Sequence, residues 1–299
     1  MGTQPGPIGQ KLPPNKSYAM KNILVPTDFS VFAGYALDAA LLFARRFDAH
    51  LHLVHVAKTT KESDHKLDVA TTGNTATVVS VAERLQQMVL PFNDIPCSTR
   101  VLTGTLPQVL TAYVDQHGID LIVMGSHGAS GKHEYFVGSN TQKVVRSVFC
   151  PVLILKQPLK SIQFDKVVFA SGFYPEDRPA FMAFKNLVKH FVPEIHLVTI
   201  HTSSLFDPPY VLSKEVLEDF QKLCAPFKSE VHIYRDFTVD QGIRAFSSEL
   251  EADLIGISNH HRHPLKRMLV GSNVEALVNH SHLPVLSIDY QDEGRKDNY

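Results

Sequence analysis

The chain has 299 residues, about twice the size of a typical single domain, so two domains are expected. Hydrophobic residues make up 44% and charged residues 20%, and 29 Lys and Arg against 30 Asp and Glu give a net charge of −1. This balance excludes the basic surface of a general nucleic-acid binder, and no apolar run reaches the roughly 18 residues of a membrane span, so we expect neither partner.

Residues 1–19 contain Gly, Pro and Lys but lack the hydrophobic stretch of a secretory signal. They predict a flexible tail and a cytoplasmic protein, and the polar residues 291–299 predict a C-terminal tail. Cys97, Cys150 and Cys224 are too few and too scattered for a disulfide framework or a CxxC metal site. We expect these cysteines to be reduced and mostly buried.

From Met20 onward, short apolar runs rich in β-branched residues alternate with longer segments of helical spacing. Near-continuous apolar strands that alternate with helices are typical of a parallel sheet covered on both faces. Each half of the chain contains five such runs. The predicted strands are 23–26, 51–56, 97–102, 121–124 and 152–155 in the first half, and 167–170, 195–200, 231–234, 254–257 and 285–288 in the second.

The two halves repeat each other in sequence. A shift of 133 residues places 120–127 over 253–260 and 137–140 over 270–273, whereas a shift of 144 aligns the earlier strands, for example 52–54 with 196–198. The difference indicates a deletion in the second half, where the first half carries the polar stretch 58–77, which predicts a loop or mobile lid. Two homologous α/β domains, 20–157 and 163–290, are therefore predicted, and the short joint between them predicts that they pack together.

A ligand of such a sheet binds beyond the carboxyl ends of the strands, where the strand order reverses. In the first half Asp28 closes the first strand, Gly125 and Gly128 follow the fourth, and Gly138 and Ser139 open the last helix. Glycines let a ligand approach the backbone, and a helix N-terminus favours an anion, so phosphate is the natural occupant.

Part of this pattern has an explanation that needs no ligand. Ser139 with Gln142 fits a Ser-x-x-Gln capping box, which Ser272 and Glu275 repeat in the second half. The loop that holds Gly125 and Gly128 has no comparable structural reason in the sequence, and it therefore favours a binding site.

The spacing Gly125-x2-Gly128-x9-Gly138-Ser139, after a strand that ends in Asp28, resembles the universal stress protein family. The resemblance is to its ATP-binding branch in the tandem two-domain form, and it covers the chain from Met20 to about Tyr290. It implies an α/β fold with two open parallel five-stranded sheets in the order 3-2-1-4-5 and helices on both faces. It also implies pairing of the last strands, so that the halves form a pseudo-dimer within one chain, with room for a further homodimer.

Carried over by position, the family pattern implies an ATP site in the first half. The base and ribose would meet Pro26, Thr27, Asp28, Val56, Met124 and Gly125, and the phosphates would meet Gly128, Gly138, Ser139 and Asn140. Chemistry agrees for Asp28, because its carboxylate would repel phosphates but accept a hydrogen bond from an adenine amino group or a ribose hydroxyl. Mg²⁺ or Mn²⁺ on the phosphates is compatible with this site, although the sequence shows no acidic metal cluster and assigns no metal ligand.

The second half departs from the pattern. Gly172 replaces Asp28, Ser258 replaces Gly125 and His261 replaces Gly128, so only Gly271-Ser272 survives. We therefore expect one ATP per chain, bound in the first half, and a degenerate second domain.

Histidines offer a separate hypothesis. His260, His261 and His263 are close enough in sequence to suggest a metal, but no fourth ligand accompanies them, and an exposed loop is favoured. His50 and His52 alternate on one strand, which indicates a half-buried structural role.

Neither a Gly-x-Ser-x-Gly elbow nor an HExxH motif occurs, so no catalytic residue is assigned. The sequence predicts an ATP-binding regulatory or protective protein of the stress response, without naming its protein partner. Two alternatives remain open: a slow ATP hydrolase or transferase that uses the same cleft, and a metal-binding or structural module that binds no nucleotide.

Overall fold

The computed structural model describes residues 20–57, 71–127, 138–159, 161–202, 209–258 and 273–289, with the side chains of the second range from residue 80 onward. The first half contains β1 (Asn22–Pro26), α1 (Val31–Phe47), β2 (His50–Ala57), α2 (Thr71–Val89), β3 (Cys97–Thr103), α3 (Leu106–His117), β4 (Leu121–Gly125), α4 (Ser139–Ser147) and β5 (Val152–Leu155). The second half contains β6 (Lys166–Ala170), η1 (Pro175–Asp177), α5 (Arg178–Val188), η2 (Lys189–Phe191), β7 (Glu194–His201), α6 (Tyr210–Leu223), β8 (Ser229–Arg235), α7 (Val239–Glu249), β9 (Leu254–Ser258), α8 (Asn273–His280) and β10 (Val285–Ile288).

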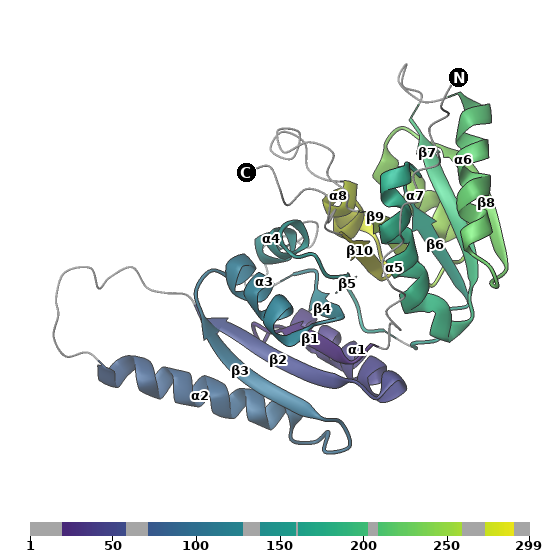
Figure 1. Cartoon of the computed structure of the whole chain (residues 1–299). Coiled ribbons are helices and arrows are strands. Elements are labelled where there is room, and N and C mark those ends of the chain that lie inside the picture. Colours follow the sequence, from purple (N-terminus) through teal and green to yellow (C-terminus); the bar gives the residue numbers. More distant parts are fainter. Residues whose placement is uncertain are drawn as a thin grey trace, which may run out of the picture.

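The ten strands form one continuous sheet in the order β3-β2-β1-β4-β5-β10-β9-β6-β7-β8 (Figure 1). Each half alone has the order 3-2-1-4-5 with parallel neighbours, so the predicted fold class and all ten predicted strands are confirmed. At the centre β5 and β10 run antiparallel, with Ile154 opposite Val285 and Leu153 opposite Leu286. The expected pairing of the two last strands is therefore present.

Helices cover both faces of the sheet, because successive strand residues point to opposite sides and both sets are apolar. Ile23 faces a core shared with α1, α2, α5 and α6, while its neighbour Leu24 faces a core shared with α3, α4, α7 and α8. The carboxyl ends of the parallel strands of each half consequently lie at one edge, next to the N-termini of the following helices.

The two halves also meet outside the strand pair. An aromatic cluster joins Phe43 of α1 to Phe164 and Phe191 of the second half, with ring centroids 6.2 and 6.1 Å from that of Phe43. On the opposite face of the sheet, Arg146 of α4 forms an ion pair with the largely buried Glu275 of α8. Contacts on both faces thus hold the halves together.

Some expectations about local structure need correction. Helix α2 begins at Thr71, so the end of the polar stretch 58–77 is helical and not loop; residues 58–70 lie outside the described residues. The two tails and the loop with His260, His261 and His263 also lie outside them. The cysteines are free, and Cys150 and Cys224 are buried.

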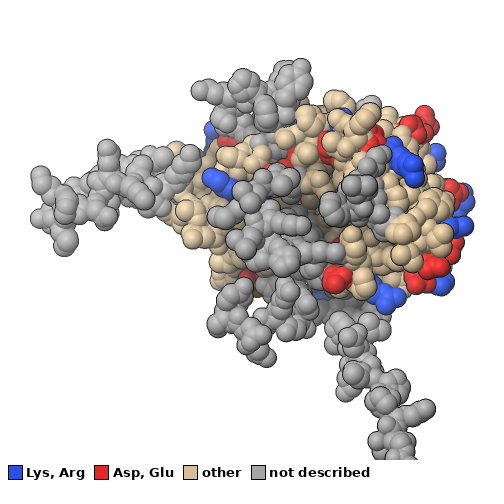
Figure 2. All heavy atoms as spheres, turned by 90° about the horizontal axis from the view of Figure 1, so that it is seen from above, with Lys and Arg blue, Asp and Glu red and all other residues tan. Residues whose placement is uncertain are grey.

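Charges on the face seen in Figure 2 are mixed: basic and acidic side chains alternate over the end of the molecule formed by the second half. Among the described residues, no helix is both long and apolar enough to cross a bilayer.

Candidate functional site

A cavity of about 420 Å³ opens at the carboxyl ends of β1, β2 and β4. Its size lies in the range of small-molecule sites. Strands β1 and β4 are neighbours although they are not consecutive, so the cavity lies where the strand order reverses, as the sequence predicts. The lining residues are Pro26, Thr27, Asp28, Ala33, Val54, His55, Val56, Gly104, Thr105, Leu106, Pro107, Met124, Gly125, His127, Asn140, Thr141 and Lys143.

The turn after β1 is built by local side-chain hydrogen bonds. Thr27 Oγ1 accepts the N–H of Phe29 at 3.0 Å, and Asp28 Oδ1 accepts the N–H of Ser30 at 3.1 Å. Ser30 is the N-cap of α1 and accepts the N–H of Ala33 at 3.2 Å. Phe29 has a positive φ of 63°, which such a tight turn requires. These bonds hold Asp28 at the cavity wall.

His55 on β2 secures this turn from the side. Its Nδ1–H donates to the carbonyl of Thr27 at 2.8 Å, and its ring stacks on Phe29 with the centroids 5.0 Å apart. The guanidinium of Arg84 from α2 lies 4.1 Å from the centroid of the Phe29 ring. Sequence reasoning missed His55, although its place near the end of the second predicted strand is a signal that could have found it.

The need for glycine at position 125 has a structural cause that the sequence does not reveal. A Cβ at this position would lie 2.6 Å from the carbonyl oxygen of Phe32, so the close approach of α1 to β4 requires glycine. Thr141 of α4 donates its hydroxyl to the Gly125 carbonyl at 2.9 Å, and the N–H of Gly138 donates to Ser126 O at 2.7 Å. These bonds hold the start of α4 against the end of β4.

The predicted capping box at α4 is wrong. The helix begins at Ser139, so Gly138 is the N-cap, and no side chain caps the helix there. Ser139 is already helical and therefore cannot take the N-cap role. Thr105, the N-cap of α3, also makes no side-chain cap hydrogen bond.

Several groups contribute positive electrostatic potential at the cavity. The first residues of α3 and α4 both line it, so the positive ends of two helix dipoles point toward it. Lys143 adds a full charge from the second turn of α4. This arrangement favours an anion.

His127 presents a buried polar atom at the wall. Its Nδ1 lies 2.7 Å from Ser126 Oγ and its ring packs on Phe32, but Nε2 has no hydrogen-bond partner within the described part of the chain. Burial, and secondarily the charge of Lys156, lowers the pKa of His127, which favours its neutral form.

Most of the residues predicted for the nucleotide meet here. Seven of them, Pro26, Thr27, Asp28, Val56, Met124, Gly125 and Asn140, line the cavity. Gly138 and Ser139 form the adjoining start of α4, and Gly128 lies outside the described residues. Contact of any of them with a nucleotide stays a prediction.

The second half repeats the turn after the first strand but not its acidic residue. Phe173 corresponds to Phe29, has a φ of 54° and donates its N–H to Ser171 Oγ at 3.0 Å. Gly172 stands where the first half has Asp28, and a Cβ there would lie 2.3 Å from the ring of Tyr174. The turn of the second half therefore presents no carboxylate at the position of Asp28.

A buried carboxylate enters the second half at another position. Asp177 corresponds to Ala33 of the cavity wall and is 5% exposed. It accepts hydrogen bonds from Ser171 Oγ at 2.7 Å, the N–H of Tyr174 at 3.0 Å and Ser258 Oγ at 2.8 Å. Ser258 stands where the first half has Gly125, so the two polar side chains that are new in the second half, Asp177 and Ser258, are hydrogen-bonded to each other. The sequence repeat places Asp177 on Ala33, and this signal could have found it.

Comparison with known proteins agrees with this arrangement of two related halves. The sequence pattern described as "Universal stress protein family" matches residues 20–156 and again residues 163–288. The chain belongs to this family. The tandem organisation expected from the internal repeat is thereby confirmed.

Curated relatives match one half of the chain. Universal stress protein MJ0531 of Methanocaldococcus jannaschii is 24% identical over 144 residues, which cover 47% of this chain and 84% of the relative. Universal stress protein YxiE of Bacillus subtilis is 28% identical over 145 residues, 45% of this chain and 97% of the relative.

Some solved structures match both halves together. A universal stress protein from Archaeoglobus fulgidus superposes with a TM-score of 0.72 at 21% identity, covering 91% of this chain and 97% of that one. Protein PA1789 from Pseudomonas aeruginosa gives a TM-score of 0.64 at 21% identity, covering 91% and 93%. At this identity the likeness concerns the fold.

Proposed function

We propose that the first half of this universal stress protein binds ATP and that the chain acts as a nucleotide-responsive regulatory or protective protein. The observation that carries the proposal is the cavity at the β1–β4 switch point, where a carboxylate, two helix N-termini and Lys143 line one space. A phosphorylated ligand with hydrogen-bond donors at its other end suits this mixture of charges.

Each part of the nucleotide has a complementary group. Asp28 would accept a hydrogen bond from the adenine amino group or a ribose hydroxyl, with Val56 and Met124 as apolar wall. The phosphates would lie at the start of α4, near Asn140 and Lys143. Asp28 is the one carboxylate of the described lining, so Mg²⁺ or Mn²⁺ would take most of its ligands from phosphate and water oxygens.

Calorimetric titration of the intact chain with ATP tests the proposal. Gly138 has φ −56° and ψ 138°, which valine adopts without backbone strain, so Gly138→Val adds bulk at the phosphates. The matched control is Gly271→Val, its counterpart in the second half. We expect one equivalent of ATP, lost in Gly138→Val and kept in Gly271→Val. Unchanged ATP affinity in Gly138→Val would refute this site.

A second variant tests the orientation of the nucleotide. Asp28→Ala should weaken ATP by about 1.5–3 kcal/mol, the contribution of a charge-assisted hydrogen bond, which is tenfold or more in affinity. Inorganic triphosphate has no group for Asp28 and should bind the variant at least as well as the parent chain. An equal loss for both ligands would place the carboxylate at the phosphates.

A further inference from the structure

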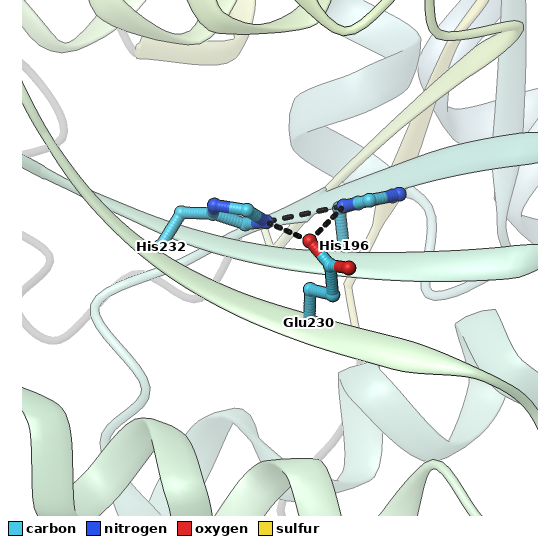
Figure 3. A group of neighbouring side chains, drawn as sticks. All are labelled: His196, Glu230 and His232. Carbon is cyan, nitrogen blue, oxygen red and sulfur yellow. Dashed lines mark hydrogen bonds and ion pairs between the residues drawn. The ribbon is translucent and has the colours of Figure 1, made fainter.

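A separate polar cluster lies in the second half, on the two outermost strands of that end of the sheet. His196 of β7 and His232 of β8 point toward each other, with the carboxylate of Glu230 beside the gap (Figure 3). His196 Nδ1 lies 3.1 Å from His232 Nε2. Glu230 Oε2 lies 3.8 Å from His232 Nε2 and 4.0 Å from His196 Nδ1. Two nitrogens and one oxygen thus face a common point.

The backbone of the sheet sets this geometry. In the parallel register of β7 and β8, His196 is opposite Glu230, and His232 is the next residue on the same face of β8. Phe246 of α7 packs on the His232 ring, with the centroids 4.7 Å apart. The His196 side chain is 4% exposed, whereas that of Glu230 is 52% exposed, so the cluster has a fixed inner side and an open outer side.

We propose that His196, Glu230 and His232 bind a divalent transition-metal ion of the zinc class. Two imidazole nitrogens and one carboxylate oxygen form a three-ligand set that leaves a position for water or another ligand. Metal–nitrogen bonds of about 2.0–2.1 Å in a tetrahedral site place two nitrogens about 3.3 Å apart, close to the observed 3.1 Å. The Glu230 oxygen needs to move by less than about 1 Å, which its exposed side chain permits.

The second ring nitrogen of His196, Nε2, supports this assignment. His196 Nε2 is buried and without a hydrogen-bond partner in the described part of the chain, and Glu194 Oε1 is 3.5 Å away. With a metal on Nδ1, His196 carries its proton on Nε2, where it faces the Glu194 carboxylate. This carboxylate–histidine–metal arrangement commonly orients metal ligands. Lys228 pairs with Glu194 at 2.7 Å and holds it in place.

Local charge and burial are compatible with a cation. Burial lowers the pKa of His196 and of His232, so the neutral rings that bind metals are favoured. Glu194 and Glu230 oppose this shift at His196, while Lys166 adds to it.

The first half shows that the fold does not require these residues. His52 corresponds to His196, but Ser98 and Arg100 stand in place of Glu230 and His232, and Tyr113 in place of Phe246. There His52 Nδ1 lies 3.0 Å from the hydroxyl of Tyr113 and 3.3 Å from that of Ser98. Two hydroxyl groups contact the shared histidine in the first half, whereas Glu230 and His232 face it in the second.

Zinc titration of the intact chain tests the proposal. The chain is first stripped with a chelator, then titrated with Zn²⁺ in competition with a chromophoric chelator, without nucleotide. Glu230→Gln and His232→Ala remove one ligand each. His260→Ala/His261→Ala/His263→Ala removes the other cluster of histidines, and His50→Ala removes a histidine of the first half as a second control. We expect one tight equivalent, weakened at least tenfold in Glu230→Gln, lost in His232→Ala and retained in both controls.

Two results would overturn the site: unchanged zinc affinity in Glu230→Gln and His232→Ala, or loss of the tight equivalent in the triple-histidine variant alone. If His232→Ala alters unfolding in the absence of metal, Glu230→Gln decides, because that side chain is half exposed. Substitution of Co²⁺ gives a second readout, since its visible absorption distinguishes a four-coordinate site from a hydrated ion. ATP affinity of Glu230→Gln should equal that of the parent chain, which separates this test from the nucleotide proposal.

Discussion

Replacing Asp177 by alanine should destabilise the second half by about 3–5 kcal/mol, because three hydrogen bonds to a buried carboxylate are lost together. The buried carboxylate accepts three hydrogen bonds, from two hydroxyls and one backbone N–H. Hydrogen bonds to a charged group contribute about 1.5–3 kcal/mol each, but the losses do not add fully because hydroxyls can find other partners. The expected loss is therefore below the simple total.

Asparagine at the same position separates charge from shape. Asp177 Oδ2 accepts from Ser171 and Tyr174, and Oδ1 accepts from Ser258. If the asparagine oxygen takes the place of Oδ2, it keeps the hydrogen bonds from Ser171 and Tyr174. The amide nitrogen then takes the place of Oδ1 and can donate to the hydroxyl of Ser258. We expect Asp177→Asn to cost about 1–2 kcal/mol, well below the cost of alanine.

Urea unfolding of the intact chain, followed by far-ultraviolet circular dichroism because the chain has no tryptophan, measures both variants. Asp115→Ala on the exposed side of α3 is the control and should stay within about 0.5 kcal/mol of the parent. A loss below about 1 kcal/mol in Asp177→Ala, or equal losses for asparagine and alanine, would refute the stabilising role of the carboxylate.

Ala33→Asp places the carboxylate of the second half into the wall of the first-half cavity, and calorimetry should show ATP affinity reduced at least tenfold; undiminished affinity would argue against the nucleotide site. Burial, followed by the charges of neighbouring basic side chains, lowers the pKa of His52 to about 4. The unfolded chain takes up this proton near pH 6.5, so stability is full above that pH and falls by up to about 3 kcal/mol as the pH decreases to 4. Urea midpoints at pH 7.5 and 4.5 should differ less in His52→Gln, and an equal difference in both proteins would exclude His52 as the cause. Each half expressed alone exposes a central strand edge and should self-associate or be insoluble, which gel filtration tests against two well-behaved monomers.

The architecture was predictable because its signals are local and repeated. Ten apolar runs mark the strands, and eight of these runs are largely buried, whereas the edge strands β3 and β8 are only partly so. The strand order came from the resemblance that Asp28 and the spaced glycines carry, and the position of the cavity depends on that order.

Contacts between distant segments were not predictable from the sequence. Gly125 is required by the backbone at Phe32, almost a hundred residues earlier, and no local pattern encodes that approach. The first helical residue of α4 depends on how Gly138 bonds to Ser126, so the capping box was misassigned. His196 and His232 meet only through the register of β7 and β8.

The antiparallel pairing of β5 with β10 joins two unlike halves that belong to one covalent chain. Their association is intramolecular, so it does not vary with protein concentration as a dimer of separate subunits would. The 1:1 ratio of the half with the cavity to the half with the buried carboxylate is likewise fixed at synthesis. A change in cellular abundance therefore alters the number of such units but leaves the composition of each one unchanged.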